Sequence, residues 1–109
     1  MAYDEGLLVR VREAVDPTVD VLEKKMFGGV VFMLRGNMAF GIIADELMVR
    51  VGPDAYAEAL ALPNAREMDF TGRPLRGMVM VNPEGIDMDE DLRSWVARGA
   101  EFARSLPAK

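Results

Sequence analysis

The chain contains no cysteine and no histidine among its 109 residues. Without cysteine it has no disulfide, no thiol redox chemistry and no thiolate metal ligand. Without histidine it also lacks the commonest catalytic base and the commonest transition-metal ligand, which leaves carboxylates, Lys, Tyr, Ser and Thr for acid–base or nucleophilic work. We therefore expect no catalytic residues, no metal and no cofactor, and hence a protein that is not an enzyme.

Signals that would direct the chain out of the cytoplasm are missing too. Residues 1–5 hold no basic stretch leading into an apolar run, as a secretory signal would. Nowhere do about 18 consecutive apolar residues occur, so no membrane-spanning helix is predicted. We expect a cytoplasmic protein that does not bind a membrane.

Positive charge is also scarce. Thirteen Lys and Arg stand against 18 Asp and Glu, which gives a net charge of -5 at pH 7. Phosphate backbones repel a chain of this sign, so strong direct binding to nucleic acid is disfavoured. Another protein becomes the leading type of partner, and direct DNA binding through a local basic patch is the weakest of the binding hypotheses.

The residues that are present suit one hydrophobic core. Hydrophobic residues make up 50% of the chain and charged residues 28%, an ordinary globular balance. We expect residues 1–109 to form a single domain, because this length is too short for two cores of ordinary size.

The hydrophobic period changes along the first half of the chain. Residues 4–15 place apolar side chains at helical spacing and stop before Pro17. Between Val19 and Val51, short β-branched, Met and aromatic runs alternate with glycine-containing breaks, which predicts an antiparallel meander with tight turns. Within this segment, the runs that we expect to form strands are residues 30–34, 38–44 and 47–51.

The second half alternates again. Residues 55–62 predict a short helix, the polar stretch 64–77 holds at most one short strand, and 78–81 is a final short strand. A long helix follows from about Asp89 to Arg104, with the clearest amphipathic pattern in the chain. Its apolar face consists of Leu92, Trp95, Val96, Gly99, Phe102, Ala103 and Leu106.

These elements predict a two-layer α+β fold with an antiparallel meander sheet, helices at both ends of the chain and the order α-β(3-4)-α-β(1-2)-α. The terminal helices are expected on one face of the sheet, around Trp95 and Phe102. Truncating Trp95 to alanine is then expected to cost about 3 kcal/mol or more. Two strands are apolar at nearly every position, which indicates burial on both faces, or burial on one face and a partner molecule on the other.

Two polar segments resemble ligand sites. Alternate carboxylates in 87–91 suggest the start of a calcium loop, but Leu92 and Arg98 stand where an EF-hand needs Gly and Glu, so acidic residues at a helix N-terminus are the better interpretation. Arg73 and Arg76 would present two guanidinium groups on one turn, a geometry that suits phosphate or carboxylate. A solvated loop is the plainer interpretation of that turn.

Methionine is abundant, with nine in the chain, most of them in or beside predicted strands. Flexible thioethers suit adaptable protein-binding surfaces, but Met also fills ordinary cores. We favour the core interpretation and expect some of these side chains to serve both purposes.

Residues 23–33, Glu-Lys-Lys-Met-Phe-Gly-Gly-Val-Val-Phe-Met, followed by Gly-Asn-Met-Ala-Phe-Gly-Ile-Ile over 36–43, resemble the signature of the TfoX N-terminal domain family. Further similarity lies in 47–52, in 66–74 and in the closing helix around Trp95. In the motif, two glycines are expected to relieve steric limits at a turn while the preceding Phe anchors inward. The resemblance implies a fold similar to secretion-chaperone-like two-layer α+β domains.

The same resemblance implies a role in regulating natural competence and related genes, in which longer members act as co-activators beside a DNA-bound transcription factor. Those members carry a second, helical domain, and we expect this chain to be a stand-alone N-terminal domain. The leading hypothesis is therefore a non-enzymatic protein-interaction or regulatory domain, an adaptor for a transcription factor, with a homodimer through the apolar sheet as one form. The expected interaction residues are Lys24, Lys25, Met26, Phe27, Gly28, Gly29, Arg50, Arg73 and Arg76.

The alternative hypothesis is a module that binds a small anionic ligand or a nucleotide. Its anion contacts would come from lysines and arginines gathered near the glycine-containing turn. These residues are Lys24, Lys25, Arg73 and Arg76.

Overall fold

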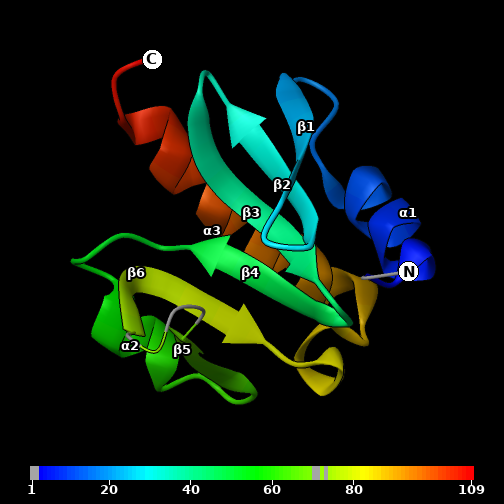
Figure 1. The fold of residues 1–109 in the computed structure, drawn as a ribbon, viewed down its shortest axis with the longest axis vertical. Coiled ribbons are helices and arrows are strands. Elements are labelled where there is room, and N and C mark those ends of the chain that lie inside the picture. Colours follow the sequence, from blue (N-terminus) through cyan, green and yellow to red (C-terminus); the bar gives the residue numbers. More distant parts are fainter. Residues whose placement is uncertain (1–2, 70–71, 73) are drawn as a thin grey trace.

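The computed structural model describes residues 3–69, 72 and 74–109 (Figure 1). Its element order is that of the predicted α+β fold, so the fold class is confirmed. The elements are α1 (Glu5–Ala14), β1 (Val21–Met26), β2 (Gly29–Leu34), β3 (Asn37–Ile43), β4 (Glu46–Arg50), α2 (Tyr56–Leu60), β5 (Ala65–Asp69), β6 (Pro74–Val81), the 3-10 helix η1 (Pro83–Ile86) and α3 (Asp89–Ser105).

Two-residue turns join the first four strands, as the meander prediction requires. Phe27 and Gly28 have φ values of 56° and 75°, and Arg35 and Gly36 have 54° and 86°. Two successive positive φ angles are typical of a type I′ turn, whose twist matches that of the flanking antiparallel strands. Ala44, at φ 56°, begins the third turn.

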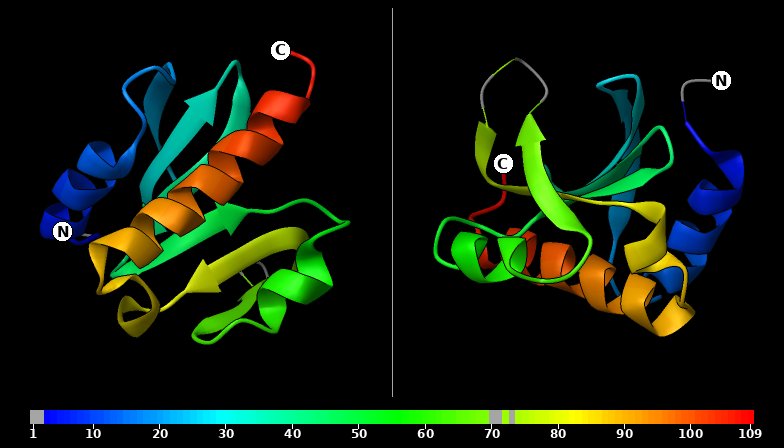
Figure 2. Two further views of the ribbon diagram at one scale, coloured as in Figure 1. Left: turned by 180° about the vertical axis from the view of Figure 1, so that it is seen from behind. Right: turned by 90° about the horizontal axis from the view of Figure 1, so that it is seen from below.

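The six strands of the described residues form one antiparallel sheet in the order β1-β2-β3-β4-β6-β5. Helices α1, α2 and α3 lie on the same side of this sheet, and α3 crosses β3 and β4 (Figures 1 and 2). The right-hand view of Figure 2 shows that the sheet curves, so that its β1–β2 end and its β5–β6 end both rise away from α3. The molecule therefore has two layers, and the helices cover one face of the sheet.

Gly99 is the point where α3 meets the sheet. A Cβ at this position would overlap the carbonyl oxygen of Ala39, so only glycine allows the two backbones to come so close. The register between β2 and β3 shifts here, and this bulge turns both Ala39 and Phe40 toward the helices. The rings of Phe32 and Phe40 stack with their centroids 4.9 Å apart.

The predicted apolar face of α3 is largely buried, and Trp95 is 7% exposed. Phe102 and Leu106 are only half-buried, which differs from the prediction, because the last turns of α3 run past the central strands. Phe102 instead covers Gly52, where a Cβ would overlap its ring. In the described part of the chain, neither α3 nor any other helix is long and apolar enough to span a membrane.

The last strand is longer than predicted. β6 begins at Pro74 rather than at residue 78, because Gly77 takes a φ of 89° and bends the strand instead of ending it. The carbonyl oxygen of Gly77 accepts bonds from the backbone N–H groups of Val51 (2.8 Å) and Gly52 (3.1 Å). β1 and β5 are the edge strands of the sheet. Most of their residues are exposed and many are charged, so the sequence shows no apolar alternation there that would mark where the strands begin and end.

Candidate interaction surface

The glycine-containing motif forms the turn of the β1–β2 hairpin, where Met26 pairs with Gly29. Gly28 supplies a positive φ, and nothing lies within 4 Å of the position that its Cβ would take. Gly29 meets a different demand, because a Cβ there would overlap the carbonyl oxygen of Ile42 on β3. The motif is thus explained first by backbone geometry, and only its exposed side chains remain for binding.

The face of the sheet away from the helices carries a second apolar cluster, which we call the methionine layer. No helix of the described residues covers it, yet its centre is at most 6% exposed because the curved sheet folds over its own side chains. The central residues are Val31, Met48, Met68, Met78 and Met80. The half-buried residues around them are Met26, Phe27, Met33, Met38, Ile43 and Leu75.

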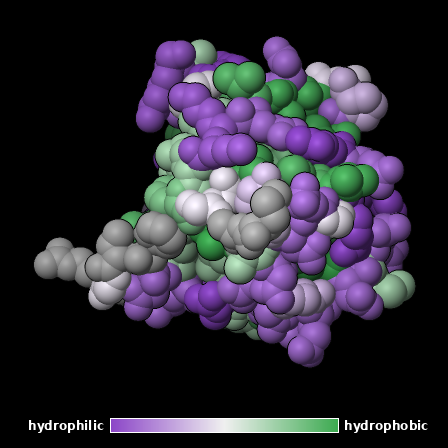
Figure 3. All heavy atoms as spheres, turned by 45° about the vertical axis from the view of Figure 1, so that its right-hand side comes forward, coloured by the Kyte–Doolittle hydropathy of each residue, from purple (hydrophilic) through white to green (hydrophobic). Residues whose placement is uncertain are grey.

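Of the eight methionines among the described residues, seven belong to this layer. The central methionines are core residues, which agrees with the core interpretation of the sequence, and the half-buried methionines form the rim of the layer. Figure 3 shows that apolar atoms reach the surface in patches separated by hydrophilic bands rather than as one continuous plate. The accessible part of the layer is therefore its rim, which includes the β1–β2 turn.

Lys24 and Lys25 are exposed side chains of β1 that point to opposite faces. Lys24 shares the methionine face with Met26, and Lys25 shares the helix side with Glu23. Within the described residues neither lysine side chain has an ion pair or a hydrogen bond. β1 therefore presents two uncompensated cations, one on each face.

Glu23, between these cations and the helices, is already paired. It accepts bonds from Nε of Arg12 at 2.7 Å and from Nη2 of Arg12 at 2.8 Å. These bonds lower the pKa of Glu23 and raise the pKa of Arg12. The carboxylate thus neutralises an arginine of α1 rather than a lysine of its own strand.

Arg50 has a structural position. It is half-buried at the end of β4, and its Nη1 donates a bond to the carbonyl oxygen of Met38 at 3.4 Å. Its guanidinium carbon lies 5.4 Å from the centroid of the Phe102 ring, a cation–π contact. These contacts join β3, β4 and α3.

The remaining predicted arginines lie far along the sheet from β1. Arg73 is outside the described residues, and Arg76 is exposed on β6. The pKa of Tyr56, on α2, is raised mainly by burial and next by the negative charge of Glu67, and the positive charge of Arg76 opposes this rise. The guanidinium group of Arg76 therefore lies near α2. Because β2, β3 and β4 separate β1 from β6, the sheet order does not bring Arg76 beside Lys24.

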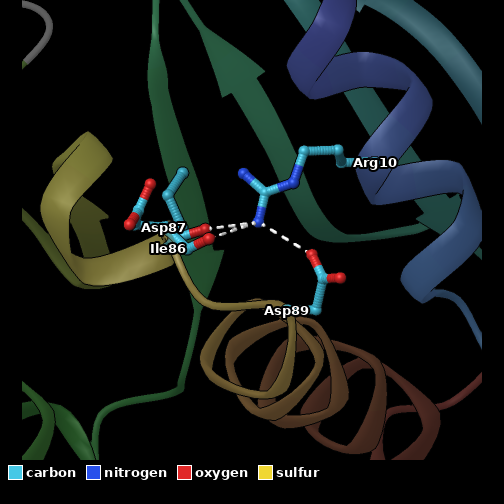
Figure 4. A network of polar contacts seen from close by, with 4 residues as sticks. All are labelled: Arg10, Ile86, Asp87 and Asp89. Carbon is cyan, nitrogen blue, oxygen red and sulfur yellow. Dashed lines mark hydrogen bonds and ion pairs between the residues drawn. The ribbon is translucent and has the colours of Figure 1, made fainter.

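The acidic run before α3 binds an arginine of the chain itself (Figure 4). Nη2 of Arg10 donates to the carbonyl oxygens of Ile86 (2.7 Å) and Asp87 (3.1 Å) and to Oδ1 of Asp89 (3.1 Å). Among the described residues no group of three acidic side chains is placed to hold a metal ion. The run therefore fastens α1 to the start of α3.

A family model of the TfoX N-terminal domain matches residues 13–103. The chain belongs to the TfoX N-terminal domain family. The match covers the whole sheet and nearly all of α3, so the hairpin motif lies within the part that defines the family. Comparisons with curated proteins and with solved structures found no match.

This TfoX N-terminal domain has an open hollow of about 380 Å³ beside β1. Leu22, Lys24 and Met33 line it from the methionine face, and Leu22 is 64% exposed. Asp20, Val21, Arg35 and Gly36 complete its lining. Sequence reasoning missed Leu22 and Arg35, because only the pairing of β1 with β2 brings this exposed leucine near the Arg-Gly turn.

A larger hollow of the same TfoX N-terminal domain, about 550 Å³, lies between α1 and α3. Val15, Val96 and Ala100 provide apolar lining there. Its charged lining carries both signs: Glu13, Asp16, Glu101, Arg93 and Arg104. This mixture favours no one sign of ligand, in contrast to the cation-rich hollow beside β1.

Proposed function

We propose that the protein is a non-enzymatic interaction domain with a regulatory role of the competence type, an adaptor that binds a transcription factor or another regulatory protein. Membership of the TfoX N-terminal domain family supports the regulatory part. The observation that carries the interaction part is the β1 side of the sheet, where unpaired lysines lie beside an exposed leucine and the rim of the methionine layer.

A protein partner fits the charges better than a nucleic acid does. The net charge of -5 opposes an extended phosphate backbone, while the cations of β1 form only a small local patch. Such a patch suits a carboxylate-bearing protein segment, which needs few contacts. The half-buried methionines are adaptable enough to pack against an apolar side chain of the same partner.

The proposal is tested by affinity purification of the tagged full chain from its native cells after cross-linking, with partners identified by mass spectrometry. A transcription regulator or polymerase component recovered with the wild type and depleted with Lys24→Glu is expected. Arg76→Glu makes the same charge change on the far side of the sheet and should recover the partner normally. Recovery of no specific protein by wild type would overturn the adaptor role.

A further inference from the structure

The outer edge of β1 is open to another strand. A two-residue hairpin closes on a hydrogen-bonded pair, here Met26 and Gly29, so alternate residues back along β1, Lys24 and Leu22, also bond to β2. The residues between them direct their backbone N–H and C=O groups outward. These residues are Val21, Glu23 and Lys25. In the described part of the chain none of the three has a backbone hydrogen bond beyond the sheet.

The surroundings of this edge have the opposite sign from the protein as a whole. Lys24, Lys25 and Arg35 have no ion pair among the described residues, and Glu23 is taken up by Arg12. Of the described residues that line the neighbouring hollow, only Asp20 carries a carboxylate. A net charge of -5 on the chain thus coexists with an excess of cations along β1, which favours a partner bearing carboxylates.

The same edge offers apolar contact. Leu22 is 64% exposed and, with the half-buried Met33, forms an apolar part of the hollow. Figure 3, which turns this side of the molecule forward, shows apolar atoms near the top with hydrophilic side chains around them. A strand laid beside β1 would place every second side chain on this face, against Leu22 and Lys24 in turn.

A second copy of the chain fits this edge poorly. When two β1 strands pair antiparallel about a two-fold axis with their outward groups bonded, one residue faces its own copy across the axis. The two registers that pair most of β1 put Glu23 or Lys24 there, and like charges directly opposite each other are destabilising. A register centred on Leu22 avoids this repulsion but pairs only residues 21–23 of the strand. The charge pattern of β1 therefore favours a different chain.

We propose that the edge of β1 and its hollow bind an extended segment of a partner protein as a seventh strand, and that this segment carries carboxylates beside at least one apolar side chain. Backbone bonds to Val21, Glu23 and Lys25 provide affinity, as in other cases of strand addition. Lys24, Arg35 and Leu22 select the side chains. This inference rests on the proposed protein-binding role and specifies its site.

The test begins with a displayed library of random 12-residue peptides selected on the full-length wild-type protein. Enrichment of peptides that combine acidic with apolar residues is expected, and one enriched peptide is synthesised with a fluorescent label as the probe. Reversing one charge in Lys24→Glu should weaken its binding about fivefold, whereas Arg76→Glu should leave it unchanged. Selection of no peptide, or of peptides without acidic residues, would overturn the proposal.

Amide hydrogen exchange with the same probe separates strand addition from simple charge attraction. Slower exchange at the outward amides of Val21, Glu23 and Lys25 is expected, with little change at Leu22 and Lys24, which already bond to β2. Lys25→Pro removes one outward N–H and should weaken the probe more than Lys25→Ala, which keeps that group. Protection of another element by the probe would contradict the proposal.

Failure of this inference differs from failure of the adaptor role. If the Lys24→Glu and Lys25→Pro variants recover the cross-linked partner as well as the wild type does, the adaptor role stands and β1 is rejected as its site. Absence of any specific partner rejects the adaptor role, whatever the peptides show.

Discussion

The carbonyl oxygen of Ile42 occupies the place where a Cβ on Gly29 would stand. Gly29→Ala therefore forces β2 and β3 apart, and we expect it to lower the free energy of unfolding by about 3 kcal/mol. Gly28→Ala changes only a residue with positive φ in open space and should cost about 1 kcal/mol. Urea denaturation of both variants measures the difference. Equal costs would show that turn conformation, not strand contact, explains the motif.

For Gly99→Ala, helix propensity and packing predict changes of opposite sign in the free energy of unfolding. Helix propensity alone predicts that alanine stabilises α3 by about 1 kcal/mol. The overlap with the carbonyl oxygen of Ala39 predicts a net loss of about 1–3 kcal/mol instead. Thermal and urea unfolding decide the sign, with exposed Ala97→Gly on the same helix as the propensity control. A stabilised Gly99→Ala variant would contradict the close crossing of α3 and β3.

Much of the fold was predictable because its signals are local. The apolar spacing of α3 identified Leu92, Trp95 and Val96, and the glycines at 28 and 36 marked the first two turns. The start of β6 was missed, because Gly77 resembles a strand end in the sequence but is a bend in the structure. Contacts such as that of Arg10 with Asp89 join distant segments, and no local pattern reports them.

The bond between Arg12 and Glu23 predicts a pH dependence. The lowered pKa of Glu23 means that this pair stabilises the fold above the ordinary carboxyl pKa of 4.5 and that the benefit disappears as the pH falls through the lower, folded-state pKa. Stability measured by urea titration at several pH values should show Arg12→Ala below wild type at pH 6, with the gap narrowing progressively as the pH falls below 4.5. Exposed Arg93→Ala is the control. A constant gap between wild type and Arg12→Ala would refute the pairing.

Oxidation should distinguish the centre of the methionine layer from its rim. Mild peroxide is expected to convert the half-buried Met26 and Met33, and Met88 at 60% exposed, to sulfoxides before it reaches Met48, which is fully buried. Peptide mapping over time gives the order. Early oxidation of Met48 would mean that the curved sheet leaves the centre of the layer open.

The candidate surface was only partly predictable. The motif was recognised as a unit, but the sequence did not show that Gly29 serves packing while Lys24 and Lys25 diverge to opposite faces. Arg50 looked available and is instead held by Met38. Which cations are paired depends on tertiary contacts, so the unpaired edge of β1 became visible only in the folded chain.

The central claim is that the domain binds a regulatory partner through the open edge of β1. The decisive measurement is amide hydrogen exchange followed by NMR, first on the free protein and then on its complex with the purified partner that cross-linking identified. If β1 accepts a strand of the partner, the amides of Val21, Glu23 and Lys25 exchange fast in the free protein and slowly in the complex. Slow exchange at these amides in the free protein, or fast exchange that the partner leaves unchanged, would contradict it.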